Sequence, residues 1–256
     1  MSLMGAYTKD AMIHSRDELR ALPLPQPQGP WHQPVPFVDF IDLIDDEISR
    51  AGLRVASEEH FTLKDGMRHF GVLTVTDGYE ELGGDGWTMM LGIRGAHDRS
   101  MSRGISFGRH VTVCSNGMFT GELGRFFTKQ TSHIWDRLRE LVRRGIDRIP
   151  GLVKDEQDKI ERMMMARLAL GQGDHILAHV FREGGLSAQQ LGHALKEWEV
   201  PTFDAHLDEG RNLWLVEQAV TQAVKPAGTA PVSPMVLAEK TQIANRVIAD
   251  YLPQAA

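Results

Sequence analysis

The sequence predicts an α+β protein in which an antiparallel β-meander of about four strands precedes a helical C-terminal half. Two observations lead to this class. Residues 54–121 alternate apolar and polar side chains with the two-residue period of β-strands. Beyond Gly124, apolar residues recur at helical spacing almost to the end of the chain. Strands that precede helices, instead of alternating with them, argue against a doubly wound parallel sheet.

The N-terminal segment is rich in proline. Six of the twelve prolines lie within residues 23–36, PLPQPQGPWHQPVP. Because proline fixes φ and biases the preceding residue towards extended geometry, we expect a stiff proline-rich arm over residues 1–36. A ligand for a proline-recognition module is the alternative interpretation of the same residues.

The first helix is predicted directly after the arm. Its apolar face consists of Phe40, Ile41, Ile44 and Ile48 at helical spacing. Its opposite face carries the acidic run Asp42, Asp45, Asp46 and Glu47. We interpret this run as a solvated face and not as a metal site, and we expect Gly52 to end the helix.

Four strands follow the first helix. They are predicted near residues 60–63, 70–75, 87–93 and 105–113. The first two flank Asp65-Gly66, a dipeptide that favours a tight type I′ hairpin turn. A polar loop over residues 94–104 separates the last two strands.

The remainder of the chain is predicted to be helical. Helices are expected near residues 134–149, 155–170, 174–183, 187–199, 211–225 and from 234 onward. Thr131 or Ser132 is the expected cap of the first, and Ser187 with Gln190 forms a capping-box pattern at the fourth. We assign residues 37–150 to one α+β domain with the meander and a long helix. Residues 151–256 form a helical region that either packs on this domain or stands as its own unit.

Composition and charge exclude several classes of protein. The net charge of −6 argues against a surface that coats DNA or a membrane as a whole. The single cysteine excludes an internal disulfide and a cysteine-rich metal site. Met1 to Arg20 lack the apolar run of a signal peptide, and no run of about eighteen apolar residues is present to span a bilayer. We therefore expect a cytoplasmic protein with no membrane partner.

Signals for catalysis are weak. Cys114 and His110 would lie about 13 Å apart on one strand, whereas a working cysteine–histidine pair needs about 3 Å. His175 and His179 lie one helical turn apart after Asp174, but no third metal ligand is marked. Motifs for nucleotide binding and hydrolysis are absent from the sequence. The sequence favours a protein that is not an enzyme and has neither metal nor cofactor, and a Cys114- or metal-dependent enzyme is the less favoured alternative.

The distribution of charge is the best guide to function. Residues 94–144 hold ten basic and four acidic side chains, a balance of +6, so the remainder carries −12. A basic band on an acidic molecule is typical of a local phosphate-binding surface. Its predicted phosphate contacts are Arg94, Arg99, Arg103, Arg109, Arg125 and Lys129. Phe119, Phe126 and Phe127 lie close in sequence and are candidates to stack on unpaired bases or to form core.

Two segments of the chain resemble a known family. They are residues 94–100, RGAHDRS, and residues 108–119, GRHVTVCSNGMF. Both resemble the phage/plasmid-like protein family, described as a domain of unknown function, which has a ShDgS-like loop and then a strand ending in Val-Cys-x-Asn-Gly. Residues 212–214 and 219–221 are similar to its C-terminal "lW…avT" segment. Ala96 stands where the family has serine before His-Asp, which puts a role for a hydroxyl there in doubt.

The resemblance implies a phage, prophage or plasmid protein that works in a bacterial cytoplasm, and it transfers no catalytic residue. The residues of the resembling segments whose role stays open are His97, Asp98, Cys114, Asn116 and Gly117. Asn116-Gly117 also suits a simple tight turn, because both residues tolerate positive φ.

We therefore predict a non-enzymatic DNA-metabolism protein of a phage or plasmid that binds, and anneals, single-stranded DNA. The order of sheet and long helix is similar to the RecT/Redβ-type single-strand annealing proteins of recombination, which implies a homo-oligomer. The alternative is a protein-binding counter-defence factor that inhibits a host nuclease or sensor. The acidic remainder and the proline-rich arm favour that alternative.

Overall fold

A computed structural model describes residues 11–77, 82–84, 87–111, 123–202, 210–224 and 234–253 of the chain. It confirms the α+β class, with an antiparallel sheet and a helical C-terminal half. The chain divides into two compact units. Unit 1 comprises residues up to His110 together with Gly121–Val153, and unit 2 comprises Val111–Thr120 and Lys154–Ala256.

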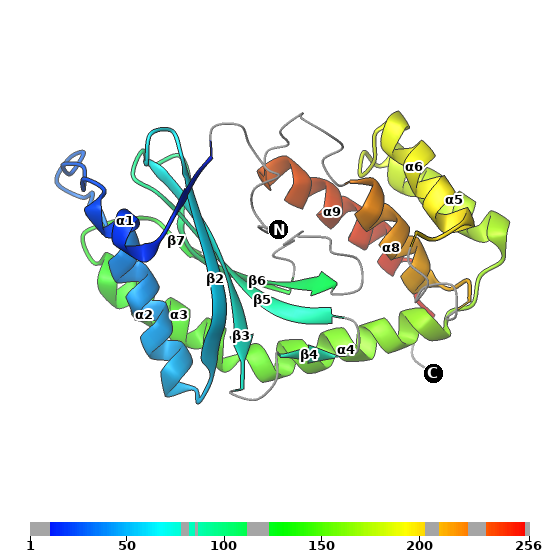
Figure 1. The fold of residues 1–256 in the computed structure, drawn as a ribbon, viewed down its shortest axis with the longest axis horizontal. Helices are drawn as coiled ribbons and strands as arrows, with labels where there is room; N and C mark the ends of the chain where they lie inside the picture. Colours follow the sequence, from blue (N-terminus) through cyan, green and yellow to red (C-terminus); the bar gives the residue numbers. More distant parts are fainter. Residues whose placement is uncertain are drawn as a thin grey trace. The chain divides into compact units, whose positions relative to one another are not determined.

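Unit 1 contains one β-sheet, which has seven strands in the described residues (Figure 1). The strands are β1 (Met12–His14), β2 (Arg54–Leu63), β3 (Arg68–Thr76), β4 (Gly83–Gly84), β5 (Trp87–Ala96), β6 (Arg103–Val111) and β7 (Gly124–Thr128). Their order is β1-β2-β3-β5-β6-β7, and the two-residue β4 pairs with β5. The predicted meander is thus present as β2, β3, β5 and β6, and β1 and β7 extend it at its two edges.

The hairpin predicted at Asp65-Gly66 joins β2 to β3. Asp65 and Gly66 have φ values of 51° and 82°, the positive values that a type I′ turn requires. The Met67 amide donates a hydrogen bond to the Lys64 carbonyl at 3.0 Å and closes the turn. Glycine removes the steric cost of positive φ at its position, so this local signal was sufficient to predict the hairpin.

The described part of the predicted arm, residues 11–36, is not extended throughout. It contains β1 and the helix α1 (Arg16–Ala21). Ser15 and Glu18 form a reciprocal capping box at the start of α1, in which the Ser15 amide donates to Glu18 Oε2 at 2.7 Å. The Ser-x-x-Glu spacing is visible in the sequence, so this helix had a local signal that the proline content obscured.

Two helices pack on one face of the sheet. They are α2 (Phe37–Arg50), as predicted, and α3 (Ile134–Asp147). A Cβ added at Gly145 of α3 would lie 2.8 Å from Ile105 Cδ1, which shows how closely the helix approaches β6. The buried apolar side chains between sheet and helices include Phe40, Ile41, Ile44, Ile48, Leu73, Leu91, Ile93, Phe107, Leu138 and Val142. Removal of this apolar surface from water is the main force that holds the layers together.

The start of α3 differs from the prediction. His133, and not Thr131 or Ser132, occupies the N-cap position, and it makes no side-chain hydrogen bond there. Thr131 Oγ1 instead accepts a hydrogen bond from Arg137 Nη1 at 2.9 Å. The hydroxyl therefore ties the loop before α3 to the first turn of the helix without capping it.

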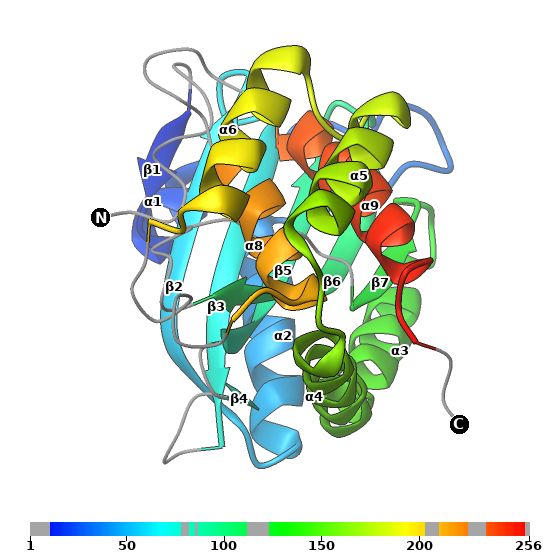
Figure 2. The same ribbon diagram turned by 90° about the vertical axis from the view of Figure 1, so that its right-hand side faces the viewer.

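From Lys154 onward, the regular secondary structure elements of unit 2 are helices in its described residues (Figure 2). Its helices are α4 (Ile149–Met165), whose first residues belong to unit 1, α5 (Leu170–Arg182), α6 (Ala188–Glu199), α8 (Leu213–Ala223) and α9 (Pro234–Ala249). The capping box predicted at α6 is confirmed, because the Ser187 amide donates to Gln190 Oε1 at 2.9 Å. Trp198 is fully buried and donates from Nε1 to the Leu170 carbonyl at 3.0 Å.

None of the helices in the described ranges combines the length and the apolar character that crossing a membrane requires.

Candidate nucleic-acid interface

The six basic residues predicted to contact phosphates have different environments. Arg99, Arg125 and Lys129 are exposed. Arg103 is 0% exposed and Arg109 is 9% exposed, so both side chains are buried and do not offer a charge to a phosphate at the surface. The prediction is corrected for these two arginines. Counting charges along the sequence did not take into account which face of the strand each side chain occupies.

Arg94 is half-buried and lies against an aromatic ring. Its Cζ lies 3.8 Å from the ring centroid of Phe127, which places the guanidinium on the aromatic face. Burial, and then the charge of Arg125, lower the pKa of Arg94. Phe127 is therefore occupied by a cation of the protein itself and is not a free platform for a base on that side.

Arg103 is buried beside the start of α2. Its guanidinium carbon lies 5.0 Å from the ring centroid of Phe37 and 5.6 Å from that of Phe40. None of its three guanidinium nitrogens has a hydrogen-bond partner within the described residues. Burial lowers the pKa of Arg103 to about 9. A sequence signal existed, because Arg103 precedes Ile105 and Phe107 at the two-residue spacing of one strand face.

The residues of the resembling segments have structural roles where they are described. His97 is 3% exposed, and its ring lies 4.1 Å from that of Phe37. Asp98 Oδ1 accepts from the Ser100 amide at 3.0 Å, and its Oδ2 accepts from Arg68 Nε at 2.8 Å. These bonds fix the loop between β5 and β6, in which Arg99 has a φ of 62°.

The remaining three residues of the resembling segments, Cys114, Asn116 and Gly117, lie outside the described residues.

Two of the exposed cations meet at a pocket of about 490 Å³. We call it the arm pocket, and it is lined by residues 28–32 of the proline-rich arm, 99–102 of the β5–β6 loop and 129–131 of the β7–α3 loop. All three segments belong to unit 1. Its volume lies within the range of pockets that hold small organic ligands.

The charge of the arm pocket has one sign. Arg99 and Lys129 are the charged residues among the twelve that line it, and no carboxylate is among them. Trp31 lines the same pocket and is 75% exposed, which is unusual for so large an apolar side chain. Two cations beside an accessible indole are suited to an anion that carries an aromatic group.

Two further side chains of the arm pocket have unused hydrogen-bonding capacity. His32 is 8% exposed, its Nδ1 accepts from the Gln28 amide at 3.0 Å, and burial followed by the charge of Arg99 lowers its pKa. Its proton is therefore on Nε2, which has no partner in the described part of the chain. Gln130 donates from Nε2 to the Ala96 carbonyl at 2.5 Å, while its buried Oε1 is unpaired among the described residues.

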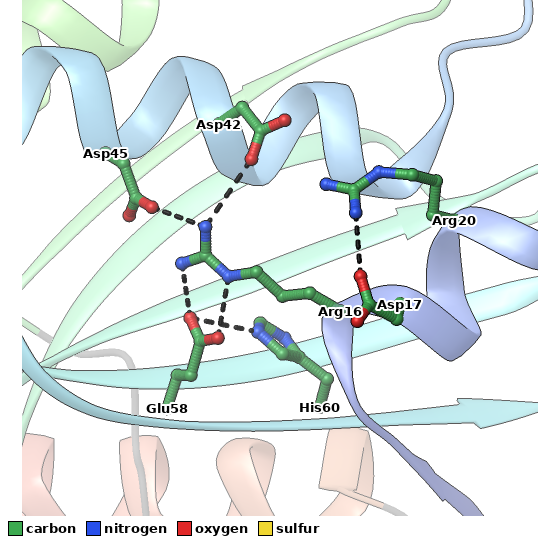
Figure 3. Close-up of polar contacts among 7 residues, drawn as sticks. All are labelled: Arg16, Asp17, Arg20, Asp42, Asp45, Glu58 and His60. Carbon is green, nitrogen blue, oxygen red and sulfur yellow. Dashed lines mark hydrogen bonds and ion pairs between the residues drawn. The ribbon is translucent and has the colours of Figure 1, made fainter.

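The acidic run of α2 is not simply solvated, which corrects our interpretation. Asp45 Oδ2 lies 2.5 Å from Arg16 Nη1, and Asp42 Oδ1 lies 3.4 Å from the same nitrogen (Figure 3). Glu58 of β2 accepts from Arg16 through both carboxylate oxygens and lies 3.4 Å from His60 Nε2. Burial acts to raise the pKa of Glu58, but the neighbouring His60 ring and the Arg16 guanidinium outweigh it and lower the pKa to about 2.

The histidine pair of α5 is not part of a metal site in the described residues. His179 Nδ1 lies 3.0 Å from the Tyr251 hydroxyl oxygen, and His175 is exposed. Across the described ranges, no group of three or more histidine, cysteine, aspartate or glutamate side chains has a geometry that could hold a metal ion.

Family models, curated proteins and solved structures were each compared with the chain, and none of them matches it. Its function must therefore be argued from its own residues.

Proposed function

We propose that the protein binds single-stranded DNA without acting as an enzyme, and that one nucleotide of the strand occupies the arm pocket. The base stacks on Trp31, and the two phosphates that flank the nucleotide contact Arg99 and Lys129, one phosphate at each cation. The observation that carries the proposal is that an exposed indole and two cations line one pocket that has no carboxylate in its lining.

Stacking explains why an unpaired strand is the preferred ligand. A base that is already stacked in a duplex does not offer its face to Trp31, whereas a base in a single strand does.

The net charge of the molecule limits the number of phosphates it neutralises. The chain carries −6, so attraction to DNA depends on local cations and not on the overall field. With two phosphate contacts, we expect log Kd to depend on log salt concentration with a slope of about 1.4 in magnitude for a single strand. This modest slope distinguishes the arm pocket from an extended basic groove.

The first test is fluorescence anisotropy of an oligothymidylate of about ten nucleotides across a series of NaCl concentrations. Trp31→Leu should weaken binding about fivefold or more, because the aromatic face is lost, and Trp31→Phe should retain most of the affinity. Arg99→Gln and Lys129→Gln should each reduce the salt slope by about 0.7. Arg54→Gln removes an exposed arginine of β2 away from the pocket and should change neither quantity.

Three results would contradict the proposal. They are equal affinity for a duplex of the same sequence, equal binding by Trp31→Leu, and no binding at low salt. A mononucleotide at the same concentration serves as a further control, because binding as tight as that of the oligonucleotide would indicate a nucleotide-binding protein instead.

A place in phage or plasmid DNA metabolism, annealing activity and a homo-oligomeric state are also part of this proposal. Light scattering on the protein with and without the oligonucleotide tests the last of these. A particle of one chain in both samples, with a mass of 28.6 kDa in the absence of the oligonucleotide, would remove the comparison with annealing rings and filaments.

A further inference from the structure

The second feature that could bind a ligand is a group of buried polar groups between the sheet and the first turn of α2. It consists of the side chains of Arg103, His69 and His97, which are 0%, 0% and 3% exposed, and of the backbone amides that begin α2. We call it the α2 donor cluster. All of its members belong to unit 1, and its three side chains do not line the arm pocket.

Sheet register and ring contacts bring the three side chains together. His69 of β3 pairs with Gly95 of β5, so the Cβ positions of the two residues are about 5 Å apart on one face of the sheet. A Cβ added at Gly95 would lie 2.9 Å from Arg103 Cζ, which brings the guanidinium within about 8 Å of His69 Cβ. The ring of Phe37, the first residue of α2, has centroid separations of 4.9 Å from His69 and 4.1 Å from His97. Arg103 Cζ lies 5.0 Å from the centroid of the same ring.

The charge of Arg103 has no counter-ion in the described part of the chain. None of the guanidinium nitrogens has a hydrogen-bond partner there. The side chain is nevertheless charged at neutral pH, because burial lowers its pKa only to about 9. Contact with the rings of Phe37 and Phe40 offsets only part of the free-energy cost of removing an ion from water. Arg16, by contrast, is more exposed and still has three carboxylate partners.

The other groups of the α2 donor cluster have unused hydrogen-bonding capacity as well. The Nδ1 atoms of His69 and His97 are buried and unpaired among the described residues. Pro36 occupies the N-cap position of α2 and makes no side-chain hydrogen bond, so no cap covers the first amides of this fourteen-residue helix. These amides carry the partial positive charge of the helix N-terminus. Asp98 follows His97 in the sequence, but both of its oxygens already accept hydrogen bonds from other residues.

We infer that the α2 donor cluster binds a small inorganic anion, such as chloride, between Arg103 and the first amides of α2. Helix N-termini are ready-made anion sites, and a buried guanidinium supplies the opposite charge. The anion is small because the side chains around it are almost completely buried, which leaves no path for a ligand that extends to the surface. A water molecule would pair with the donors but would not compensate the charge. The inference does not depend on the DNA-binding proposal.

The first test measures the melting temperature of the full chain while sodium chloride replaces sodium gluconate at a constant sodium concentration. Gluconate is too large to be enclosed, and a pH of about 8 keeps the histidines neutral. With a Kd of about 5 mM, about 500 mM chloride should raise Tm by about 5 °C or more, because the anion binds only the folded state. Sodium bromide should give a similar rise, since bromide is only slightly larger than chloride.

Substitutions of arginine assign the effect to the α2 donor cluster. Arg103→Met should abolish the rise in Tm with chloride, because it removes the charge and keeps most of the side-chain volume. Without chloride this variant should melt no lower than the wild type, since it no longer buries an ion that lacks a counter-ion. Arg103→Lys retains the charge and should retain part of the rise. Arg16→Met is the matched control, because Arg16 has carboxylate partners of its own, and its Tm should rise with chloride as in the wild type.

Anomalous diffraction at the bromine edge locates the ion whether or not Arg103→Met folds. Wild-type crystals grown in sodium bromide should show a bromide peak in contact with the Arg103 guanidinium and the first turn of α2. A water molecule in that place, no peak there, or an equal rise in Tm with chloride in the wild type and in Arg103→Met would overturn the inference. A peak beside Arg99 or Lys129 alone would assign anion binding to the arm pocket instead.

Discussion

At the scale of single residues, the basic side chains under α2 are buried instead of solvated. The pKa of His97 is lowered to about 4, chiefly by burial and then by the charges of Arg103 and His32. His69 is completely buried as well, and its pKa is well below the usual value. These imidazoles are therefore neutral in the folded protein at neutral pH.

This neutrality predicts an acid-sensitive core. In the unfolded chain His97 gains a proton below its ordinary pKa of 6.5, but in the folded protein only near 4. The free energy of unfolding should therefore fall as the pH drops through this window, by about 2 kcal/mol from His97 between neutral pH and about pH 5. Urea unfolding of the wild type and of His97→Gln at the two pH values measures it.

The free energy of unfolding of His97→Gln should depend less on pH than that of the wild type, whatever the stability of the variant at neutral pH. Protonation of Glu58 does not affect the comparison, because it contributes to the pH dependence of stability only from about pH 4.5 down to about pH 2. Equal pH dependence in both proteins would show that His97 is not the titrating group.

At the scale of elements, one arginine joins three pieces of secondary structure. Arg16 of α1 is bound by Asp42 and Asp45 of α2 and by Glu58 of β2, with its side chain 26% exposed. The hydrogen bond to Glu58, together with Asp45, raises the pKa of Arg16 despite burial. A six-residue helix has little stability of its own, so such tertiary contacts decide whether α1 forms.

Removing this cation should therefore cost stability. Arg16→Met should lower the free energy of unfolding by about 2 kcal/mol, less than for a fully buried pair because the site is partly solvated. Arg20→Met breaks a pair with Asp17 in the same helix, whose side chains are 58% and 93% exposed. Its effect should stay within about 0.5 kcal/mol. Urea denaturation compares the two, and equal losses would refute the role given to Arg16.

At the scale of the whole molecule, each unit has its own buried centre. In unit 1 it lies between the sheet and α2 and α3. In unit 2 it includes Trp198, which packs so closely on α5 that a Cβ at Gly173 would lie 2.1 Å from its Cε2 atom. The ring is held by packing on one side and by its hydrogen bond to Leu170.

Substitution by alanine is therefore expected to change the stability of the protein differently at two glycines of α5. Gly173→Ala should destabilise the protein by about 1–3 kcal/mol, because the methyl group forces Trp198 out of place. A Cβ at Gly171 meets nothing within 4 Å. Gly171→Ala should be neutral or stabilise the helix by up to about 1 kcal/mol.

Hydrogen exchange of the full chain locates the effect of these substitutions. Faster exchange in Gly173→Ala should begin in the amides of α5 and α6, which hold the tryptophan. If both substitutions destabilise the protein equally, the loss comes from the helix itself and not from displacement of the Trp198 indole.

The sequence predicted what depends on neighbours along the chain. The turn at Asp65-Gly66, the capping box at Ser187 and the meander all follow from local spacing, and the structure contains them. Of the predicted phosphate contacts, Arg99 and Lys129 come together at the arm pocket. Arg103 was misjudged because a charge count does not identify the buried face of a strand.

Trp31 and His32 were missed as site residues for a different reason. They belong to the arm and reach the pocket only because the chain folds back on loops that lie about seventy and one hundred residues further on. No local pattern encodes that approach. The one available signal was a tryptophan within a proline-rich segment, where burial is not expected.

Several large side chains of the core fit only because a glycine faces them. A Cβ at Gly95 would lie 2.9 Å from Arg103 Cζ, and one at Gly71 would lie 2.5 Å from His60 Nδ1. Evolution can therefore enlarge either glycine only if its partner becomes smaller. Among relatives of this protein, positions 71 and 60, and positions 95 and 103, should covary, so that each pair is inherited as a unit.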